Sequence, residues 1–251
     1  MALSLVCINI EGSKHLDRVL PFLKERQPDV VCVQELRQDD ISRFEEVAGP
    51  LVAYEIMRYW QPALEPDGIG IFSKQHARDK KTTYYRKVSG ELPPFDARSA
   101  ETKYVSENIM FTRADFEKDG VLYRIGTTHF TWTPNGKSNA FQHADLEKLL
   151  PILEEAGEIV FCGDFNAPRG GEIFAELAKR YTDNIPEKYE WSLDLQLHRA
   201  GKAIPKDAQE MGLKGYMVDG LFSTPGYKVS DVELVNGLSD HCAVVATIEK
   251  S

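Results

Sequence analysis

Apolar runs of about strand length recur along the chain, and most of them stop at a polar residue or a turn signal. Several of these runs contain no polar alternation, which is typical of strands covered on both faces. The predicted strands are residues 3–8, 30–33, 51–57, 68–72, 106–112, 121–128, 159–162, 217–223, 227–235 and 243–248.

Four segments between these runs carry helical spacing instead. Residues 14–26 place Leu16, Val19, Leu20 and Leu23 on one face and stop before Pro28. We also predict helices over 39–47, over 138–155 with a kink or break at Pro151, and over 172–181. Many strands with few helices favour two packed sheets with helices outside, built as one domain over residues 1–251.

The composition adds few restrictions. At 251 residues with 42% hydrophobic content, the chain is an ordinary globular protein, and no apolar run approaches the ~18 residues that span a membrane. The N-terminus passes straight into a strand, so we expect no signal peptide. We also expect a cytoplasmic location, no membrane partner and a monomer. The cysteines show no CxxC pairing and lie mostly in apolar runs, which predicts reduced core thiols (Cys7, Cys32, Cys162 and Cys242).

Charge is unevenly distributed. The net charge of −9 argues against a general polyanion-binding surface but leaves room for an enzyme that grips phosphates locally. Residues 74–107 carry more basic than acidic side chains and little core signal. Two interpretations stay open for them: a substrate-facing loop, or a solvated edge hairpin. Residues 184–216 are irregular and polar, and form a second candidate substrate loop.

Polar residues that suit catalysis gather where strands end. The run 159–162 leads through Gly163 to Asp164 and Asn166, which would face the same way if the backbone stayed extended. Other strands end at or contain further members of the set: Asn9, Glu11, Glu35, His129, Asp219, Asp240 and His241. Any one of them alone is most simply a turn former. Their recurrence predicts a site at the ends of the sheets.

The residue types suit one reaction. Carboxylates with an amide, and no cysteine ligand set, favour Mg²⁺ or Mn²⁺ over zinc. Histidines held in the charged form by carboxylates can donate hydrogen bonds to phosphoryl oxygens. An acid such as Asp164 can orient and deprotonate an attacking water. Together these groups predict metal-assisted hydrolysis of a phosphoester.

Six motifs in order resemble those of the endonuclease/exonuclease/phosphatase superfamily, which includes deoxyribonuclease I. They are Asn9-Ile10-Glu11-Gly12, Gln34-Glu35, Thr128-His129, Gly163-Asp164-Phe165-Asn166, Val218-Asp219-Gly220-Leu221-Phe222 and Ser239-Asp240-His241. The resemblance implies a four-layer α/β/β/α sandwich of two mixed sheets with flanking helices. The run His129-Phe130-Thr131-Trp132 is most similar to the tyrosyl-DNA phosphodiesterase and deadenylase branches.

The resemblance also implies roles. Glu35 would be the principal metal ligand, with Asn9, Glu11 and Asp240 completing or supporting the metal site. Glu11 stands where many members have the shorter Asp. Asp164 would activate the water with Asn166 beside it, and Asp219 would orient His241. His241 and His129 would hold the phosphate.

The sequence therefore predicts a Mg²⁺-dependent phosphodiesterase that binds DNA or another nucleic acid, or a nucleic-acid adduct. The basic segment 74–107 favours that substrate. The acidic net charge favours the alternative, a small phosphoester such as a lipid headgroup or sugar phosphate. A catalytically inactive binding protein is a third possibility, and the presence of Asp164, Glu35 and His241 argues against it. Trp132 is either a base-stacking platform or a residue packed under its loop.

Overall fold

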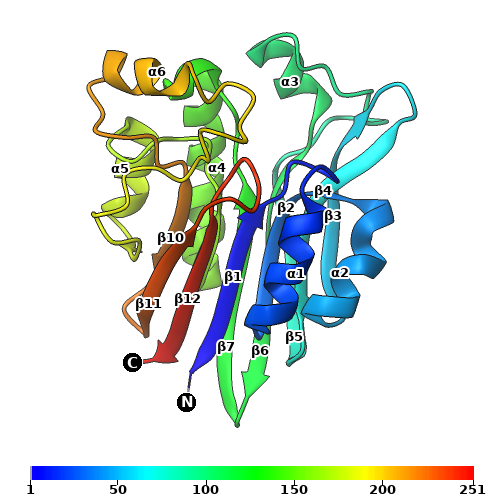
Figure 1. The fold of residues 1–251 in the computed structure, drawn as a ribbon, viewed down its shortest axis with the longest axis vertical. Coiled ribbons are helices and arrows are strands. Elements are labelled where there is room, and N and C mark those ends of the chain that lie inside the picture. The colour runs from blue at the N-terminus through cyan, green and yellow to red at the C-terminus, as the bar shows by residue number, and fades with distance from the viewer. Residues whose placement is uncertain (1) are drawn as a thin grey trace.

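Two six-stranded sheets stack face to face in the computed structural model, which describes residues 2–251 (Figure 1). The first sheet has the order β11-β12-β1-β2-β4-β3, and the second has the order β5-β6-β7-β8-β10-β9. In the first sheet the strands are β1 (Leu3–Asn9), β2 (Val30–Arg37), β3 (Leu51–Trp60), β4 (Glu65–Ser73), β11 (Tyr227–Val235) and β12 (Ala243–Lys250). In the second they are β5 (His76–Arg86), β6 (Ile109–Lys118), β7 (Val121–His129), β8 (Val160–Asp164), β9 (Thr182–Asp183) and β10 (Asp219–Ser223).

Both sheets are mixed, and each has one parallel pair at its centre. β1 runs parallel to β2, and β7 runs parallel to β8, while the remaining pairs are antiparallel. The parallel pairs send the ends of β1 and β8 to the same end of the sandwich, which lies at the top of Figure 1. The chain's two termini lie at the opposite end.

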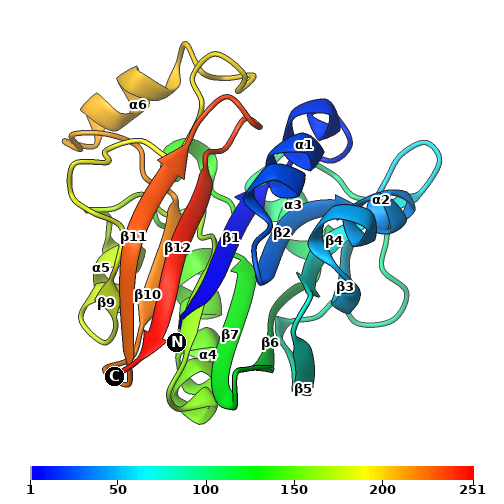
Figure 2. The same cartoon turned by 60° about the horizontal axis from the view of Figure 1, so that its bottom comes forward.

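Helices cover the outer faces of both sheets. α1 (Leu16–Arg26) and α2 (Ile41–Ala48) pack on the first sheet, and α4 (Ala140–Ala156) and α5 (Glu172–Ala178) pack on the second (Figure 2). The period of two in β1 decides which side chain goes where. Leu5 and Cys7 face the second sheet, whereas Val6 and Ile8 face α1. The predicted four-layer sandwich is confirmed.

Two further helices lie at the end of the sandwich where β1 and β8 finish. α3 (Ala100–Ser106) lies above one side of that end, and α6 (Ile204–Glu210) lies above the other (Figure 1). Two short 3₁₀ helices, η1 (Gln38–Asp40) and η2 (Pro134–Gly136), complete the secondary structure. The sequence analysis missed α3 and α6, because neither seven-residue segment has a strong apolar stripe.

The structure decides between the two interpretations of segment 74–107 over part of its length. Its first part is β5, an edge strand paired with β6, so the edge-hairpin interpretation holds there and a substrate loop over residues 76–86 is wrong. Arg78 and Lys81 pair with the half of β6 next to the β6–β7 turn. They therefore lie far from the strand ends that carry the predicted site. The remainder of the segment includes α3.

Several smaller predictions were adjusted by the structure. α4 continues through Pro151, so no break occurs there. β2 runs past Glu35, where the sequence analysis ended it. The four cysteines are buried and free, as predicted. No helix among residues 2–251 combines the length and the apolar character that a membrane crossing requires.

Candidate active site

Three neighbouring strands place His129, Asp164 and Asp219 side by side. His129 is paired with Asp164 between parallel β7 and β8, and Asp219 is paired with Asp164 between antiparallel β8 and β10. Gly163 permits this register, because its φ is +147° and a Cβ there would lie 2.0 Å from the carbonyl oxygen of Thr128. The close approach of β8 to β7 at Gly163 thus places Asp164 between His129 and Asp219.

Asp164 lies at the centre of the polar contacts. Its Oδ2 accepts a hydrogen bond from Asn9 Nδ2 at 3.1 Å and lies 3.4 Å from His129 Nε2 and 3.6 Å from His241 Nε2. Burial by itself would raise the pKa of this carboxyl. The charges of His241 and His129 outweigh it and hold the pKa of Asp164 well below its usual range. Asp164 is therefore ionised at neutral pH.

His241 is held between two carboxylates. Its Nδ1 lies 2.8 Å from Asp219 Oδ2, and its Nε2 faces Asp164. Burial favours the neutral imidazole, but the Asp219 and Asp164 charges raise the pKa of His241 well above its usual value. The ring is therefore an imidazolium: Nδ1 donates to Asp219, and Nε2 lies 3.6 Å from Asp164 Oδ2, beyond hydrogen-bond distance.

His129 approaches Asp164 from the other side. Despite its burial, the hydrogen bond and charge of Asp164 raise the pKa of His129. Its Nδ1 is buried without a hydrogen-bond partner among residues 2–251. His129 and His241, the two histidines predicted to hold the phosphate, thus both contact the carboxylate of Asp164.

Glu35 owes its position to a β-bulge in β2. Its φ is +57°, and the pairing of β2 with β4 shifts register between Val33 and Leu36. Such bulges turn a side chain out of the regular alternation of a strand. Glu35 Oε1 lies 3.0 Å from Arg58 Nη2. Burial would raise the pKa of Glu35, but the charges of Arg58, His129 and His241 lower it to about 2.

Arg58 was not predicted, although it carries much of the local charge. It lies in β3 and also forms ion pairs with Asp67 at 3.0 Å and Glu107 at 3.4 Å. Its side chain is only 6% exposed. The sequence holds one signal for it: Arg58 directly follows the predicted strand 51–57, so extending that strand by one residue would include it.

Asp240 and Glu11 lie at the edge of this cluster. Burial raises the pKa of Asp240 to about 6, with the charge of His241 opposing and those of Glu35 and Glu11 adding to the rise. Glu11 itself has φ +49° and binds Lys14 and His15. Its carboxylate is therefore engaged on the α1 side, in line with the longer side chain noted from the sequence.

The backbone does not stay extended from Asp164 to Asn166, so the two side chains do not face the same way for that reason. Its φ is +49°, its N–H donates to Asp164 Oδ1 at 2.8 Å, and its Nδ2 donates to the carbonyl of Phe130 at 2.9 Å. Asn166 thus ties the turn after β8 to the segment after β7. The extended geometry considered from the sequence is wrong at this residue.

His198 is a second residue that the sequence analysis missed. It comes from the loop 184–216, and its Nε2 lies 4.0 Å from Asp240 Oδ2. Its ring centroid is 6.5 Å from that of His241. Burial and the nearby His241 charge lower the pKa of His198. It follows no strand, so the pattern that revealed the other residues could not find it.

Asp164, Asp219 and His241 place ligand atoms within 4.8 Å of one another, close enough to hold a metal ion. A metal requires a neutral imidazole, however, and both nitrogens of His241 face carboxylates that keep the ring charged. An imidazolium that is hydrogen-bonded to Asp219 and ion-paired with Asp164 fits this arrangement better than a metal centre. The cluster around Glu35 and Asp240 offers oxygen donors instead.

A sequence profile of the Endonuclease/Exonuclease/phosphatase family matches residues 7–241. The chain belongs to this family, whose members hydrolyse phosphoester bonds. A search among curated proteins found no match to the sequence.

Solved structures show the same fold at low identity. A family member from Bacteroides vulgatus is 18% identical with a TM-score of 0.69, and all of both chains is covered. The catalytic domain of human Nocturnin with bound sulfate is 15% identical with a TM-score of 0.65, covering 100% of this chain and 94% of that one. A Bacteroides thetaiotaomicron mannosyl-6-phosphatase is 12% identical with a TM-score of 0.64, covering 98% and 99%.

Proposed function

We propose that the protein is a divalent-metal-dependent phosphoester hydrolase whose reaction is centred on Asp164. The observation that carries this proposal is the contact of one buried, ionised carboxylate with Asn9, His129 and His241, while Asp219 holds the far nitrogen of His241. An anion flanked by two donors of positive charge suits a reaction in which a water attacks a negatively charged group.

Each of these side chains has a part in the proposed reaction. Asp164 orients a water and accepts its proton as the bond to phosphorus forms. Asn9 fixes the rotamer of Asp164 through its hydrogen bond. His241 and His129 donate hydrogen bonds to the phosphoryl oxygens and offset the charge that develops there. Asp219 keeps His241 charged and oriented.

The residues around Glu35 fit a hard cation. Burial raises the pKa of Asp240, the charge of His241 opposes the rise, and the charges of Glu35 and Glu11 add to it, so negative charge gathers on this side of the site. Oxygen donors of this kind are those that Mg²⁺ and Mn²⁺ prefer. Glu35, Asp240 and Asn9 would hold the ion, and Glu11 would support it. The bound ion would supply Lewis-acid polarisation of a phosphoryl oxygen.

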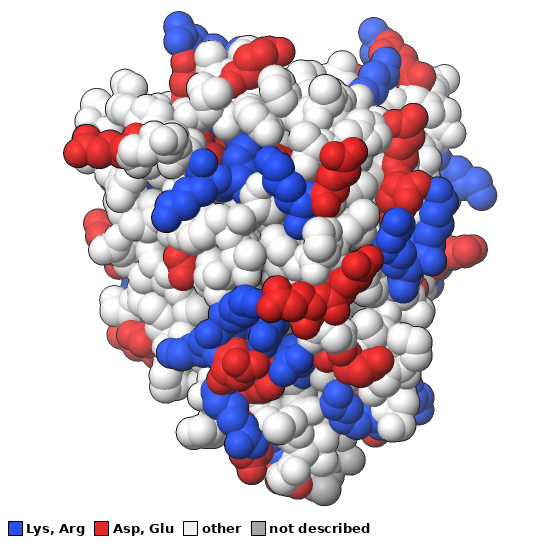
Figure 3. Space-filling model, turned by 180° about the vertical axis from the view of Figure 1, so that it is seen from behind, with Lys and Arg blue, Asp and Glu red and all other residues white. Residues whose placement is uncertain are grey.

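The charge on one face of the molecule favours a compact substrate over a long nucleic acid. On the face seen from behind, Lys and Arg side chains lie beside Asp and Glu instead of forming one basic surface (Figure 3). Two basic residues of β5 are engaged locally, with Arg78 paired to Glu117 and Lys81 to Glu155.

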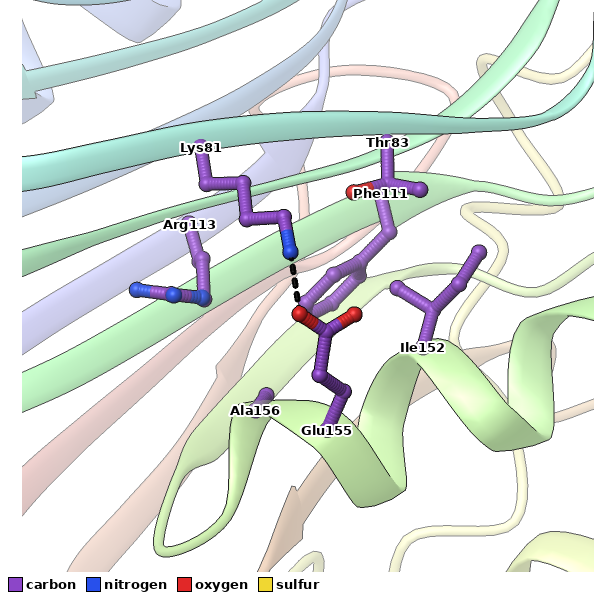
Figure 4. A pocket seen from close by; sticks show the side chains of 7 residues that line it. All are labelled: Lys81, Thr83, Phe111, Arg113, Ile152, Glu155 and Ala156. Carbon is purple, nitrogen blue, oxygen red and sulfur yellow. Dashed lines mark hydrogen bonds and ion pairs between the residues drawn. The ribbon is translucent and has the colours of Figure 1, made fainter.

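A close view shows the Lys81–Glu155 pair reaching from β5 to α4, beside Arg113 (Figure 4). The cavity next to this pair has a volume of only about 10 Å³, room for a single water. Lys81 therefore bridges the edge strand β5 and α4 at the surface, and no substrate-sized cavity lies beside it among the described residues. The observation that favoured nucleic acid from sequence is thereby weakened over residues 76–86.

A groove at one edge of the sandwich also lacks basic side chains. We call it the edge groove; it has a volume of about 940 Å³ and lies between the edge strands β3 and β5, lined by Tyr54, Glu55, Tyr59, Tyr84, Glu91 and other residues. None of its described lining residues is Lys or Arg. It would repel a phosphate backbone. We therefore propose a small phosphoester, such as a sugar phosphate or nucleotide, as the substrate.

The test is turnover on a matched panel with Mg²⁺, and with chelator as a control. The panel holds bis(p-nitrophenyl) phosphate, mannose 6-phosphate, a mononucleotide, single-stranded DNA, duplex DNA and RNA. We expect metal-dependent hydrolysis of a small ester at a rate above that of every polymer. Rapid metal-dependent cleavage of one polymer would replace the proposed substrate class with nucleic acid. Absence of hydrolysis across the panel would contradict the proposed activity.

A further inference from the structure

Cations and aromatic rings alternate in a row beside Glu35. We call this row the cation–aromatic ladder; in order it consists of Arg37, Trp60, Arg58, Phe95, Lys103 and Trp132. Arg37 and Arg58 lie 5.5 and 5.1 Å from the centroid of the Trp60 ring, and Arg58 lies 4.7 Å from that of Phe95. Lys103 Nζ lies 5.8 Å from the Phe95 centroid and 3.7 Å from the Trp132 centroid.

One member of the ladder differs from the other cations. Arg37 pairs with Glu65, and Arg58 pairs with three carboxylates, Glu35 among them. Within residues 2–251, the ammonium group of Lys103 makes no salt bridge and no hydrogen bond, and it contacts the two rings instead. It is nonetheless 9% exposed. A buried ammonium without an anion is costly, and ring contacts offset only ~0.5–2 kcal/mol of that cost.

The position of Lys103 links it to the proposed reaction. It lies on α3, at the end of the sandwich where the strands of the site finish, and Trp132 follows His129 by three residues (Figure 1). The charged groups that act on it are Glu107, Arg58, Arg199 and Glu35. Arg199 comes from the opposite loop 184–216 and is exposed. An anion between these two elements would face cations from both.

We propose that Lys103, held against the rings of Trp132 and Phe95, binds a second anionic group of the substrate, a phosphate that is not the one hydrolysed. The proposal rests on the proposed hydrolase function and narrows its substrate to small phosphoesters that carry two phosphates. Trp132 then serves as the wall that positions Lys103, because the ammonium occupies one face of its ring at 3.7 Å.

The direction in which the pKa of Lys103 is shifted agrees with a role in anion binding. Burial lowers the pKa of Lys103 to about 8, with Glu107 and Glu35 opposing the fall and Arg58 and Arg199 adding to it. A phosphate at the ammonium would oppose that fall and raise the pKa of Lys103.

The kinetic experiment uses two esters that differ by one phosphate. They are thymidine 5′-(p-nitrophenyl phosphate) and the same compound with a 3′-phosphate, with bis(p-nitrophenyl) phosphate as the generic substrate. We expect the 3′-phosphate to lower KM in the wild type. Lys103→Met should raise KM for the doubly phosphorylated ester by about 10- to 100-fold, the range for a charge-assisted hydrogen bond. Its KM and kcat for the other two esters should stay unchanged.

Two further variants separate charge from packing. Lys103→Arg keeps the cation and should retain the preference for the second phosphate. Lys250→Met is the matched control, because Lys250 Nζ also lies 3.7 Å from a ring centroid, that of Tyr227, at the opposite end of the sandwich. A lower Tm for Lys103→Met with an unchanged preference would mean that Lys103 only packs α3, and would overturn the inference.

A second readout needs no turnover. With ¹³C-dimethylated lysines, the resonance that is missing in Lys103→Arg identifies Lys103, and inorganic phosphate serves as the probe. We expect phosphate to raise the pKa of Lys103 and leave that of Lys250 in place. Equal responses of both lysines would overturn the inference. If none of the esters is hydrolysed, the proposed function fails, while this titration still decides whether Lys103 binds phosphate.

Discussion

His241 Nδ1 lies 2.8 Å from Asp219 Oδ2, and the two residues come from different sheets. Asp219 begins β10 of the second sheet, and His241 precedes β12 of the first. The contact therefore crosses the space between the sheets at the end where the other predicted residues gather. It orients the imidazolium so that its second nitrogen faces Asp164.

Asp219→Asn should lower kcat by about 10²–10⁴-fold, because an amide no longer holds His241 in its charged, oriented form. KM should change less, since the substrate contacts stay in place. Steady-state kinetics at saturating Mg²⁺ checks this. A kcat within twofold of the wild type would show that the Asp219–His241 contact is structural only.

Glu35→Gln should raise the Mg²⁺ concentration that the reaction requires. The neutral amide is a poorer ligand for a hard cation, so half-maximal activity should require at least about tenfold more Mg²⁺. The measurement is kcat as a function of Mg²⁺ concentration. Glu117→Gln, at the far end of β6, is the control and should leave the curve in place. A superimposable curve for Glu35→Gln would remove Glu35 from the metal site.

Arg58→Met should destabilise the fold. Three buried or half-buried carboxylates, Glu35, Asp67 and Glu107, would lose their common partner. Removing one member of a buried ion pair costs about 3–5 kcal/mol. Arg26→Met removes an exposed pair with Glu233 and should cost less than about 1 kcal/mol. Urea unfolding of both variants compares them, and equal losses would contradict the argument.

The charged interior around Arg58 also shows what the sequence could predict. Most strand positions followed from the apolar runs, because strand burial leaves a direct hydrophobic signal, and the four-layer arrangement followed from the resemblance carried by the six motifs. Ion pairing between distant segments leaves no such signal in the sequence. Arg58 reads as one polar residue after a strand, and only the fold reveals its carboxylates on β2, β4 and the segment before β6.

The residues of the site also divide into those that the sequence could predict and those that it could not. The residues at strand ends, such as His129 and Asp164, were predictable because two parallel strands end together. His198 and Lys103 lie on a loop and on a short helix whose positions depend on packing over the whole domain surface. The direction of Asn166 also depended on one backbone torsion, a left-handed φ that residue type alone does not specify.

Asp29 offers a test of the fold away from the site. Its carboxylate accepts hydrogen bonds from Ser4 N and from Gln75 Nε2 and pairs with Lys118 at 2.6 Å, so it ties β1 to the second sheet. Burial opposes ionisation, but the bonds from Lys118 and Ser4 outweigh it and lower the pKa of Asp29.

Because the folded pKa of Asp29 is depressed, its stabilisation is present above the unfolded value near ~3.9 and is lost as pH falls through the folded value. Asp29→Asn should therefore cost about 1 kcal/mol at pH 7, after screening by solvent, and less below about pH 4. Urea unfolding at several pH values measures this, with exposed Asp17→Asn as the control. A cost that stays constant with pH would contradict the ionic contribution.

The most direct test of the central claim is the turnover of Asp164→Asn on the best small ester of the panel, at saturating Mg²⁺. Asn is nearly isosteric, so the circular dichroism spectrum should match that of the wild type. The account predicts a kcat lower by about 10²–10⁴-fold, because the amide cannot accept the proton of the attacking water. Asp17→Asn should leave kcat unchanged. A folded Asp164→Asn variant with near wild-type kcat would contradict the assignment of Asp164 as the centre of the reaction.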